Sequence, residues 1–549
     1  MKKLAAAAFF CFVFLFAQAD TFTVTSNADS GPGTLREAIT LANANGRSVL
    51  DSIHFQIAAV TVEGRTIALQ SSFADLVSNL VIDGSTQAGA PFGVSDAKIR
   101  ITTAAGFELP HVFRIVNEHH ISFLGLHLDD LRLNSPSMIT SAFALQNARN
   151  ILIGEPGKGN YFTRLSTVMR DAYFLPVGKG MNDSIAFRSN IVNLSEDGNS
   201  LVSSALVFAF DNVRNLTLGG EQEQEGNFIS TGGQFVGWTY TDSNAHVNTG
   251  IYSILNNRFG CNYSQTAALP CGALYLRNGN SYGFTDTTRI VIRGNRFNTA
   301  CFNFTCPLYN YIMLEGKSGF IDIKANQFGM LNGNSDFFFS TALTAISIAG
   351  CEDGIIGGDN PADSNIIAGQ RGYAIALGGN KAIRITKNSI FCNNGGIKVS
   401  SAQLPVPKTA IFTLTDYLVE GTTLPLSKVE VFLTKQCSGC DNGKLYLGYT
   451  MAGANGAWSF TSPVLLDGAV SATGTSPQGT TGEFAKPEFR LENYTYRYPS
   501  CNQNNGYIKG VKFVAGTRYY WIRAYNGSVD TLYTEDVTDA GPGYYRFIV

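Results

Sequence analysis

The strongest constraint on the fold is a phrase that recurs through the middle of the chain. An apolar-x-apolar triplet is followed by glycine or polar residues, then by asparagine and one or two apolar residues, as in IVIRGNRFN, IDIKANQFG and IRITKNSIF. Successive asparagines are 30, 37, 30, 38, 31, 39 and 23 residues apart, a spacing typical of solenoids and propellers. These asparagines are Asn160, Asn190, Asn227, Asn257, Asn295, Asn326, Asn365 and Asn388.

Unequal spacing favours a parallel β-helix over a propeller, because each coil of a β-helix tolerates loops of different length. Alternating apolar residues such as Ile321 and Ile323 predict short strands that face the interior. Asparagine tolerates the left-handed backbone of a sharp turn, and stacked asparagines form hydrogen-bonded ladders. We therefore interpret the repeated asparagines as structural turn residues rather than as a binding site.

The composition agrees with an all-β chain. It contains 57 glycines and 12% aromatic residues, and only 15% of its residues are charged, which suits many turns and apolar strands but not a helical bundle. The formal net charge is −2 and no long basic run occurs. Phosphate binding needs a concentrated basic face, so nucleic acid is not expected as a partner.

The N-terminal segment, Met1 to Ala19, predicts a secretory signal peptide. Lys2 and Lys3 precede an apolar stretch from Leu4 to Phe16, and Ala17-Gln18-Ala19 has the form of a cleavage site. The stretch is shorter than the roughly 20 residues of a membrane-spanning helix, so cleavage between Ala19 and Asp20 is expected. No later segment is apolar enough to span a bilayer. The mature chain is therefore expected outside the cytoplasm or on the outer cell surface.

The segment DSGPGTLREAITLANAN predicts a tight turn followed by a short amphipathic helix. Thr34 and Glu37 have the spacing of a capping box, and one apolar stripe recurs at helical spacing. A stack of coils exposes its interior at each end, so such a helix would cover the first coil. The stripe consists of Leu35, Ala38, Ile39 and Ala42.

This segment carries a specific resemblance. TFTVTSNADSGPGTLREAITLANAN, followed by DSIHFQI and LVIDGSTQAG, closely resembles the N-terminal cap and first coil of secreted bacterial right-handed parallel β-helix proteins. The resemblance covers roughly residues 21–399. It implies the fold and says little about activity.

The C-terminal part differs from the repeats. Alternating segments such as KVEVFLT predict antiparallel strands, and this region resembles the immunoglobulin-like module that often follows such β-helices. The final segment, with PSCNQNNGYIKG and AGPGYYRFIV, resembles one repeat of the gliding-motility adhesin (SprB-type) family. Repeats of that family continue past the final strand, often to another cysteine, whereas this sequence stops at Val549. A truncated repeat and a different anchor both remain open.

The predicted fold class is therefore all-β, with a right-handed parallel β-helix, an N-terminal helix cap and two smaller β modules. The expected organisation is a signal peptide (1–19), the β-helix cap (20–57), the β-helix (58–400), a linker (401–409), an immunoglobulin-like β-sandwich (410–488) and an adhesin-repeat-like module (489–549).

Parallel β-helices commonly act on acidic polysaccharides, so carboxylates are the first candidates for chemistry. Asp129 and Asp130, with His127 nearby, are weak catalytic candidates, because hydrolysis of a glycoside needs two carboxylates across a groove. Neighbouring residues on a strand point to opposite faces, so only a turn would let both carboxylates face one groove. Elimination on a uronic acid needs cations, but Arg384 and Lys387 alternate with apolar residues as on a solvated face.

No cofactor or metal site is expected. His119 and His120 beside Glu118 should diverge on a strand. Asp359, Asn360 and Asp363 in the loop GGDNPADSN carry oxygens of the kind that calcium prefers, and calcium is the alternative there.

Aromatic residues and cysteines give further candidates. Trp238 and Tyr240 in FVGWTYTD are weak ligand-binding candidates, because rings on a loop can stack on sugars. The ten cysteines include three pairs close in sequence that can form loop disulfides in an oxidising compartment. These pairs are Cys261/Cys271, Cys301/Cys306 and Cys437/Cys440.

Together these features predict a secreted or cell-surface adhesin-like protein. Its β-helix would be a rigid shaft that binds an extracellular glycan or surface without catalysis, so an enzyme is not the favoured hypothesis. The alternative is a polysaccharide lyase or glycoside hydrolase of the parallel β-helix type.

Overall fold

The protein is nearly all β-structure, and one α-helix occurs among the residues that the structure describes. The computed structural model describes residues 19–131, 140–171, 182–203, 206–209, 213–230, 250–271, 274–277, 288–298, 310–316, 319–331, 336–337, 344–435, 442–487, 494–501, 503–510, 520–534 and 536–548. Among them no helix has the length and hydropathy needed to cross a membrane. The chain divides into two compact units at residue 191.

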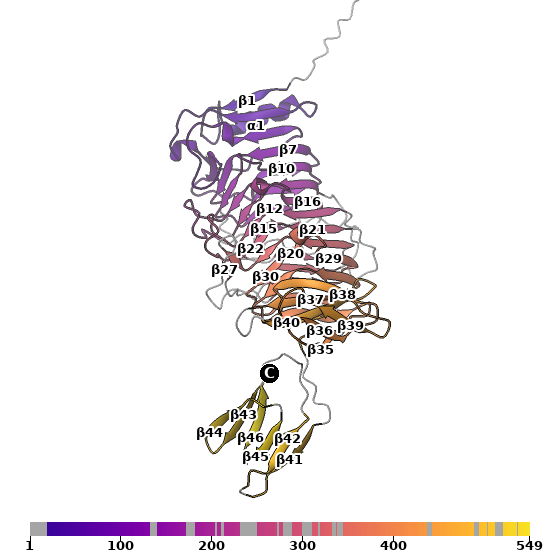
Figure 1. Ribbon diagram of the computed structural model, residues 1–549. Coiled ribbons are helices and arrows are strands. Elements are labelled where there is room, and N and C mark those ends of the chain that lie inside the picture. Colours follow the sequence, from indigo (N-terminus) through magenta and orange to yellow (C-terminus); the bar gives the residue numbers. More distant parts are fainter. Residues whose placement is uncertain are drawn as a thin grey trace, which may run out of the picture. The chain divides into compact units, whose positions relative to one another are not determined.

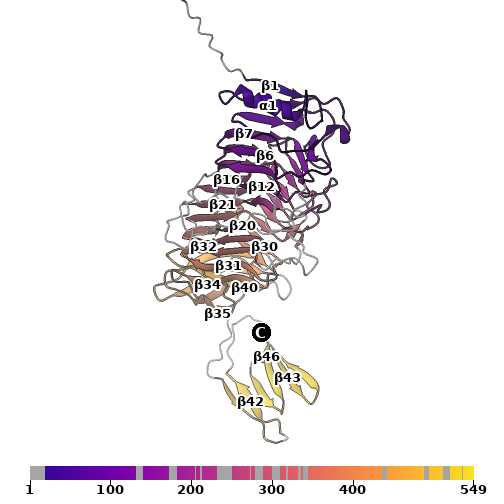
Figure 2. The ribbon, with the colours of Figure 1, turned by 180° about the vertical axis from the view of Figure 1, so that it is seen from behind.

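The first unit begins with a strand and the single helix, α1 (Leu35–Asn45), which lies beside β1 (Thr21–Val24) in both ribbon views (Figures 1 and 2). The predicted apolar stripe is buried. The Thr34 hydroxyl accepts from the Glu37 N–H, while the Glu37 carboxylate accepts from the Gly33 N–H at 2.5 Å, one residue before the N-cap. Gly33 has φ +73°, and a Cβ there would lie 2.4 Å from a Thr25 side-chain atom, so the turn requires glycine.

Three parallel sheets build the first unit, and each takes its strands from successive coils (Figure 1). One sheet has the order β1, β2 (Asp51–Phe55), β4 (Leu80–Asp83), β7 (His119–Leu124), β10 (Arg149–Ile153) and β13 (Asn182–Phe187). The second contains β3 (Thr66–Leu69), β5 (Ile99–Thr103), β8 (Leu126–Asp129) and β11 (Tyr161–Thr163). The third contains β6 (His111–Val116), β9 (Ser141–Gln146) and β12 (Thr167–Asp171). The short strands β14 (Ile191–Val192) and β15 (Leu206–Ala209) come later in the chain.

The second unit repeats this arrangement with three parallel sheets. The first contains β16 (Val213–Gly219), β18 (Ile251–Leu255), β21 (Arg289–Arg293), β24 (Phe320–Lys324), β29 (Asp353–Gly357) and β32 (Ala382–Thr386). The second contains β17 (Phe228–Ile229), β19 (Arg258–Phe259), β22 (Arg296–Phe297), β25 (Gln327–Phe328), β30 (Ile366–Ala368) and β33 (Ser389–Phe391). The third contains β20 (Leu274–Arg277), β23 (Ile312–Glu315), β28 (Ile346–Ala349), β31 (Tyr373–Asn380) and β34 (Gly395–Ala402). The pair β26 (Met330–Leu331) and β27 (Asp336–Phe337) is antiparallel.

The register of these sheets stacks like residues on like. Ile321 pairs with Ile290 on one side, and its coil places Ile323 beside Ile292. The rings of Phe259, Phe297 and Phe328 stack at centroid distances of 4.8 and 4.9 Å. Such columns bury apolar surface continuously along the stack, which is the main favourable term for a solenoid. The predicted parallel β-helix is thus confirmed.

The repeated asparagines are buried inside the turns and bonded from coil to coil. Asn160 Nδ2 donates to Asn190 Oδ1 at 3.0 Å in the first unit. In the second unit the corresponding bonds run from Asn227 through to Asn388 at 2.8 to 3.0 Å. Most of these amides also bond main-chain groups, as Asn326 Nδ2 does by donating to Ile292 O at 2.8 Å. Buried amides are therefore paired in both directions, which makes the ladder stabilising.

The sequence interpretation assigns the left-handed backbone to these asparagines, but the structure places it elsewhere. Positive φ occurs on the residue before the ladder position in several coils: Ser189 (57°), Asn256 (57°), Ala325 (55°) and Lys387 (52°). The residue before each of these asparagines therefore adopts the left-handed conformation of the turn, and the asparagine side chain that follows it is buried.

A sandwich of two antiparallel sheets follows the last coil. One sheet contains β35 (Ala410–Leu414), β36 (Leu418–Thr422) and β39 (Ala457–Thr461), and the other contains β37 (Lys428–Thr434), β38 (Leu445–Met451) and β40 (Ala469–Thr475). Trp458 is 4% exposed in the core between them. The resemblance of this sandwich to an immunoglobulin-like module stays a prediction.

The sandwich bonds directly to the last coil of the β-helix. Main-chain hydrogen bonds join Gly443 to Ile390, and the Thr481 N–H donates to Ile383 O at 3.1 Å. A separate column of amides reaches the sandwich, because Asn393 Oδ1 accepts from the Gln370 N–H at 3.0 Å and Asn442 Oδ1 accepts from the Asn393 N–H at 3.2 Å. The sandwich therefore covers the C-terminal end of the coil stack.

The C-terminal module contains two small antiparallel sheets. One contains β41 (Thr495–Arg497), β42 (Gly506–Lys509) and β45 (Val537–Ala540), and the other contains β43 (Tyr520–Tyr525), β44 (Ser528–Leu532) and β46 (Tyr544–Ile548). Its buried apolar core is Trp521, Val537 and Ala540. The resemblance to a gliding-motility adhesin repeat stays a prediction.

Candidate functional site

Asp129, at the end of β8, is buried with 0% exposure. Its carboxylate pairs with the Arg100 guanidinium from β5 and with the Arg164 guanidinium just after β11. The Thr163 hydroxyl donates to Oδ1 at 2.7 Å. Burial raises the pKa of the Asp129 carboxyl, but its charged and hydrogen-bonded neighbours, His127 first among them, lower it by more, so the pKa lies below its usual range.

His127 lies beside this carboxylate on the same strand. Its Nε2 is 2.7 Å from Thr163 Oγ1, and that hydroxyl already donates to Asp129, so Nε2 carries the proton. Its ring stacks on Tyr161 at 4.3 Å and packs against Phe92 at 5.5 Å. Burial, the largest cause, lowers the pKa of His127 to about 3, so the imidazole is neutral at physiological pH.

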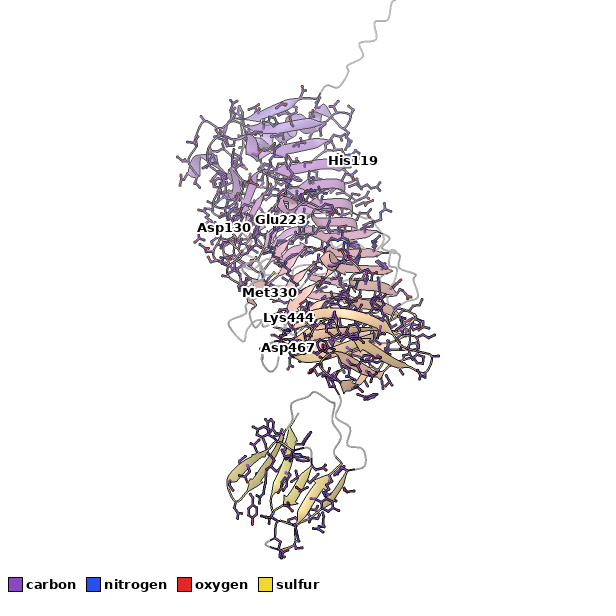
Figure 3. All side chains as sticks on the ribbon, in the orientation of Figure 1. His119, Asp130, Glu223, Met330, Lys444 and Asp467 are labelled. Atoms are coloured by element: carbon purple, nitrogen blue, oxygen red, sulfur yellow. The ribbon has the colours of Figure 1, made fainter. Side chains whose placement is uncertain are left out.

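Asp130 does not join Asp129 on one surface. It follows the strand with φ +51°, is partly exposed, and donates its N–H to Thr163 O. Figure 3 shows Asp130 and His119 on different sides of the first unit. Because the Asp129 carboxylate is enclosed by two guanidinium groups, it ties three successive coils together and offers no oxygen to a polymer on the surface.

His119 and His120 are predicted to diverge, but the structure brings them together. His120 has φ +55°, which breaks strand alternation, and the two Nδ1 atoms are 2.8 Å apart. Glu118 turns away from them and accepts from Arg47 and from the Ser78 N–H at 3.0 Å. In the described part of the chain, no group of three or more His, Cys, Asp or Glu side chains has the geometry to hold a metal ion.

The oxygens of the calcium alternative are engaged by protein groups. Asp359 contacts Arg384 at 3.2 Å, Asn360 caps the short 3-10 helix Pro361–Asp363, and Asp363 is 3.7 Å from Lys324. The loop therefore shows ion pairs and a helix cap at the positions proposed for a cation.

The cysteines show one difference from the pairs expected by sequence proximity. Cys261 and Cys271 are thiols and do not bond each other, and burial, as the largest cause, raises the pKa of Cys261 to about 12. Cys392 is disulfide-bonded, to a partner outside the described residues. Cys301, Cys306, Cys437 and Cys440 lie outside the described residues.

Two other sets of predicted residues give limited information. Trp238 and Tyr240 lie outside the described residues, as do the residues before Ala19. The Asp20 N–H, at the predicted cleavage site, donates to Asp51 Oδ1 at 2.9 Å.

The structure shows a concave aromatic surface that the sequence interpretation did not identify. A cavity of about 540 Å³ opens in the C-terminal module, lined mainly by tyrosines of β41, β42 and β46 and by Trp521. The signal in the sequence is the alternation of Tyr494, Tyr496 and Tyr498, which places three rings on one face of a strand.

No known family model and no curated protein matches the sequence. Among solved structures, a tailspike protein of E. coli bacteriophage HK620, a double mutant, aligns over 83% of this chain and 92% of its own, with 13% identity and a TM-score of 0.28. The tailspike protein gp49 of Acinetobacter baumannii bacteriophage Fri1, a capsular polysaccharide depolymerase, aligns over 85% of this chain and 82% of its own, with 11% identity and a TM-score of 0.22. At these TM-scores the alignments say nothing about the activity of this chain.

Proposed function

We propose that the chain is an extracellular, adhesin-like protein whose β-helix is a rigid shaft that binds glycans or surfaces without catalysis. The observation that carries this proposal is the burial and charge pairing of Asp129. This residue is one of the two weak carboxylate candidates in the sequence, and it is fully buried and paired with two arginines. A glycosidase needs a carboxylic acid and a carboxylate on either side of the scissile bond.

The stacked interior supports a mechanical role. Apolar columns and the asparagine ladder join each coil to its neighbours through side chains as well as main chain. Because most contacts join neighbouring coils, such a stack transmits load along its axis while loops vary. This is the property expected of a shaft that displays a binding surface.

Two observations support export. The segment before Asp20 has the form of a signal peptide, and Cys392 is disulfide-bonded. Disulfides persist in oxidising compartments and are rare in the cytosol.

The test is a binding and turnover assay on the purified chain with a panel of soluble polysaccharides, both neutral and acidic. Binding is measured by biolayer interferometry, and turnover by new reducing ends and by the ultraviolet absorbance of unsaturated uronates. We expect saturable binding without turnover. Turnover that Asp130→Asn abolishes would overturn the non-catalytic function and favour a lyase or hydrolase.

A further inference from the structure

The cavity of the C-terminal module is an aromatic groove, defined here by Tyr494, Tyr496, Tyr498, Tyr507, Trp521 and Tyr544. Several of its rings are presented to solvent: Tyr496 is 55% exposed, Tyr498 is 79% exposed and Tyr544 is 72% exposed. Trp521 is 5% exposed and closes the inner end against the small core. Single exposed tyrosines need no explanation, but several converging on one cavity indicate a binding surface.

The rings are held in a defined arrangement. Tyr494 and Tyr496 stack with centroids 6.0 Å apart, and Tyr498 packs edge-on against Tyr496 at 5.4 Å. All three line the cavity: Tyr496 lies in β41, and Tyr494 and Tyr498 flank that strand. A tyrosine loses little rotamer freedom on binding, so a row of them presents a flat surface at low entropic cost.

One charge lies in the lining of this groove, and it is positive. The Arg497 guanidinium lies 5.5 Å from the centre of the Tyr507 ring and donates to Asn505 O at 3.1 Å. Among the described residues no carboxylate forms an ion pair with Arg497, and the lining contains no acidic residue. Lys509 adds a second cation 5.3 Å from the same ring.

We propose that the aromatic groove binds an acidic glycan, with sugar rings on the tyrosine faces and a carboxylate or sulfate group on Arg497. Sugar rings have apolar C–H faces and hydroxyl edges, which match flat aromatic faces bordered by phenol hydroxyls. A planar guanidinium recognises carboxylate and sulfate oxygens by paired hydrogen bonds. This inference rests on the proposed function and assigns it a site and a ligand class.

The test uses the full chain with polygalacturonate as carboxylate probe, dextran sulfate as sulfate probe and dextran as neutral probe. Tyr496→Ala should weaken binding to the acidic probes by about tenfold or more, because a stacking face is lost. Arg497→Gln should weaken binding to the acidic probes by a similar factor and leave any binding to dextran unchanged. The carboxylate and sulfate probes together distinguish the two sources of negative charge.

The matched control is Tyr533→Ala. Tyr533 belongs to the same module and is 77% exposed, but it does not line the groove. This variant should bind both acidic probes as the unaltered chain does. Because the substituted tyrosines are exposed, all variants should keep the circular dichroism spectrum and melting temperature of the parent.

Three results would overturn the inference. Binding of an acidic glycan that neither Tyr496→Ala nor Arg497→Gln weakens would leave the proposed function standing and remove the site from the groove. Failure of the full chain to bind any polysaccharide would overturn the proposed function and this site together. A concentration-dependent dimer that Tyr496→Ala makes monomeric would show that the groove binds a second copy of the chain.

Discussion

The cover of the first coil of the β-helix buries an apolar stripe, whereas the cover of the last coil places a buried carboxylate against it. At the N-terminal end, α1 buries the stripe that begins with Leu35 and Ile39. At the C-terminal end, the sandwich contributes the buried Glu430 carboxylate, which accepts from the Thr386 hydroxyl and from the Lys387 N–H at 3.1 Å. Both covers solve the same problem, which is the exposed interior and unpaired edge of a terminal coil.

The two solutions differ in what they require. An apolar cover needs area and a helical period, and many side chains satisfy it. A polar cover needs each donor and acceptor at hydrogen-bonding distance, because an unpaired buried polar group costs about 1–3 kcal/mol. The C-terminal cover should therefore tolerate substitution less well than the N-terminal one.

The largest expected effect is at Glu430. Glu430→Ala removes the acceptor for Thr386 and Lys387 and the partner of Lys428, which lies 2.8 Å away. Removing one partner from a buried charged pair costs about 3–5 kcal/mol. Because the Lys428 side chain is partly exposed, we expect the free energy of unfolding to fall by about 3 kcal/mol. Hydrogen exchange should rise in β32, β33 and the sandwich strands but not in β1 and β2.

Two variants control this result. Glu420→Ala removes a partly exposed acidic residue of the same sandwich. It should change the free energy of local opening, as measured by hydrogen exchange, by less than about 0.5 kcal/mol. Glu430→Gln keeps a hydrogen-bond acceptor and should lower the stability by less than Glu430→Ala does. Equal exchange in Glu430→Ala and the parent would show that the sandwich does not stabilise the last coil.

The next effect is at the helix. Leu35→Ala leaves a cavity under α1 and should cost about 3 kcal/mol, within the usual range for a buried leucine. Exchange should rise in β1 and β2 while β32 and β33 stay protected, the reverse of the Glu430 pattern. Leu41→Ala is the matched control, because Leu41 lies on the same helix and is 48% exposed. A uniform rise along all coils would contradict independent covers.

A fall in pH should also lower the stability of the coils around β8 and β11. His127 titrates near pH 6.5 when unfolded and at about 3 when folded, so below pH 6.5 the unfolded chain binds a proton that the folded chain does not. The stability of the coils around β8 and β11 should therefore fall as pH falls from 6.5 toward 3, by up to about 1.4 kcal/mol per pH unit. His111, whose folded pKa is lowered to about 4, chiefly by burial, acts in the same direction.

Exchange measured between pH 6.5 and 4.5, corrected for its intrinsic pH dependence, checks this prediction. His127→Gln keeps an N–H donor toward Thr163 and should flatten the pH dependence. A pH profile that the variant leaves unchanged would assign the acid sensitivity to other groups.

The same comparison explains how much the sequence predicted. The coil repeat and the apolar stripe of α1 were predictable, because both depend on local periods of two and of 3.6 residues. The convergence of His119 and His120 was not, since it depends on one left-handed residue inside a strand. The burial of Asp129 depends on Arg164, 35 residues away, and no local pattern indicates that contact.

The polar cover and the aromatic groove were missed for a related reason. Asn442 bonds Asn393 from 49 residues further along the chain, after the repeated phrase has ended. The alternating tyrosines before Cys501 are visible in the sequence, but the cavity they line exists only once two sheets pack together. Long-range polar contacts and concave surfaces therefore mark the limit of the sequence interpretation.

The smallest effect is expected at the N-cap of α1, away from its buried stripe. Thr34→Ala removes the side chain that accepts from the Glu37 N–H and should cost about 1 kcal/mol, the usual value for an N-cap threonine. The loss should be confined to exchange of the first turn of α1, because the buried stripe stays intact. Thr34→Ser keeps the hydroxyl and should restore protection. A loss as large as that of Leu35→Ala would mean that the N-terminal cover depends on polar contacts as strictly as the C-terminal one, and the contrast between the two ends would disappear.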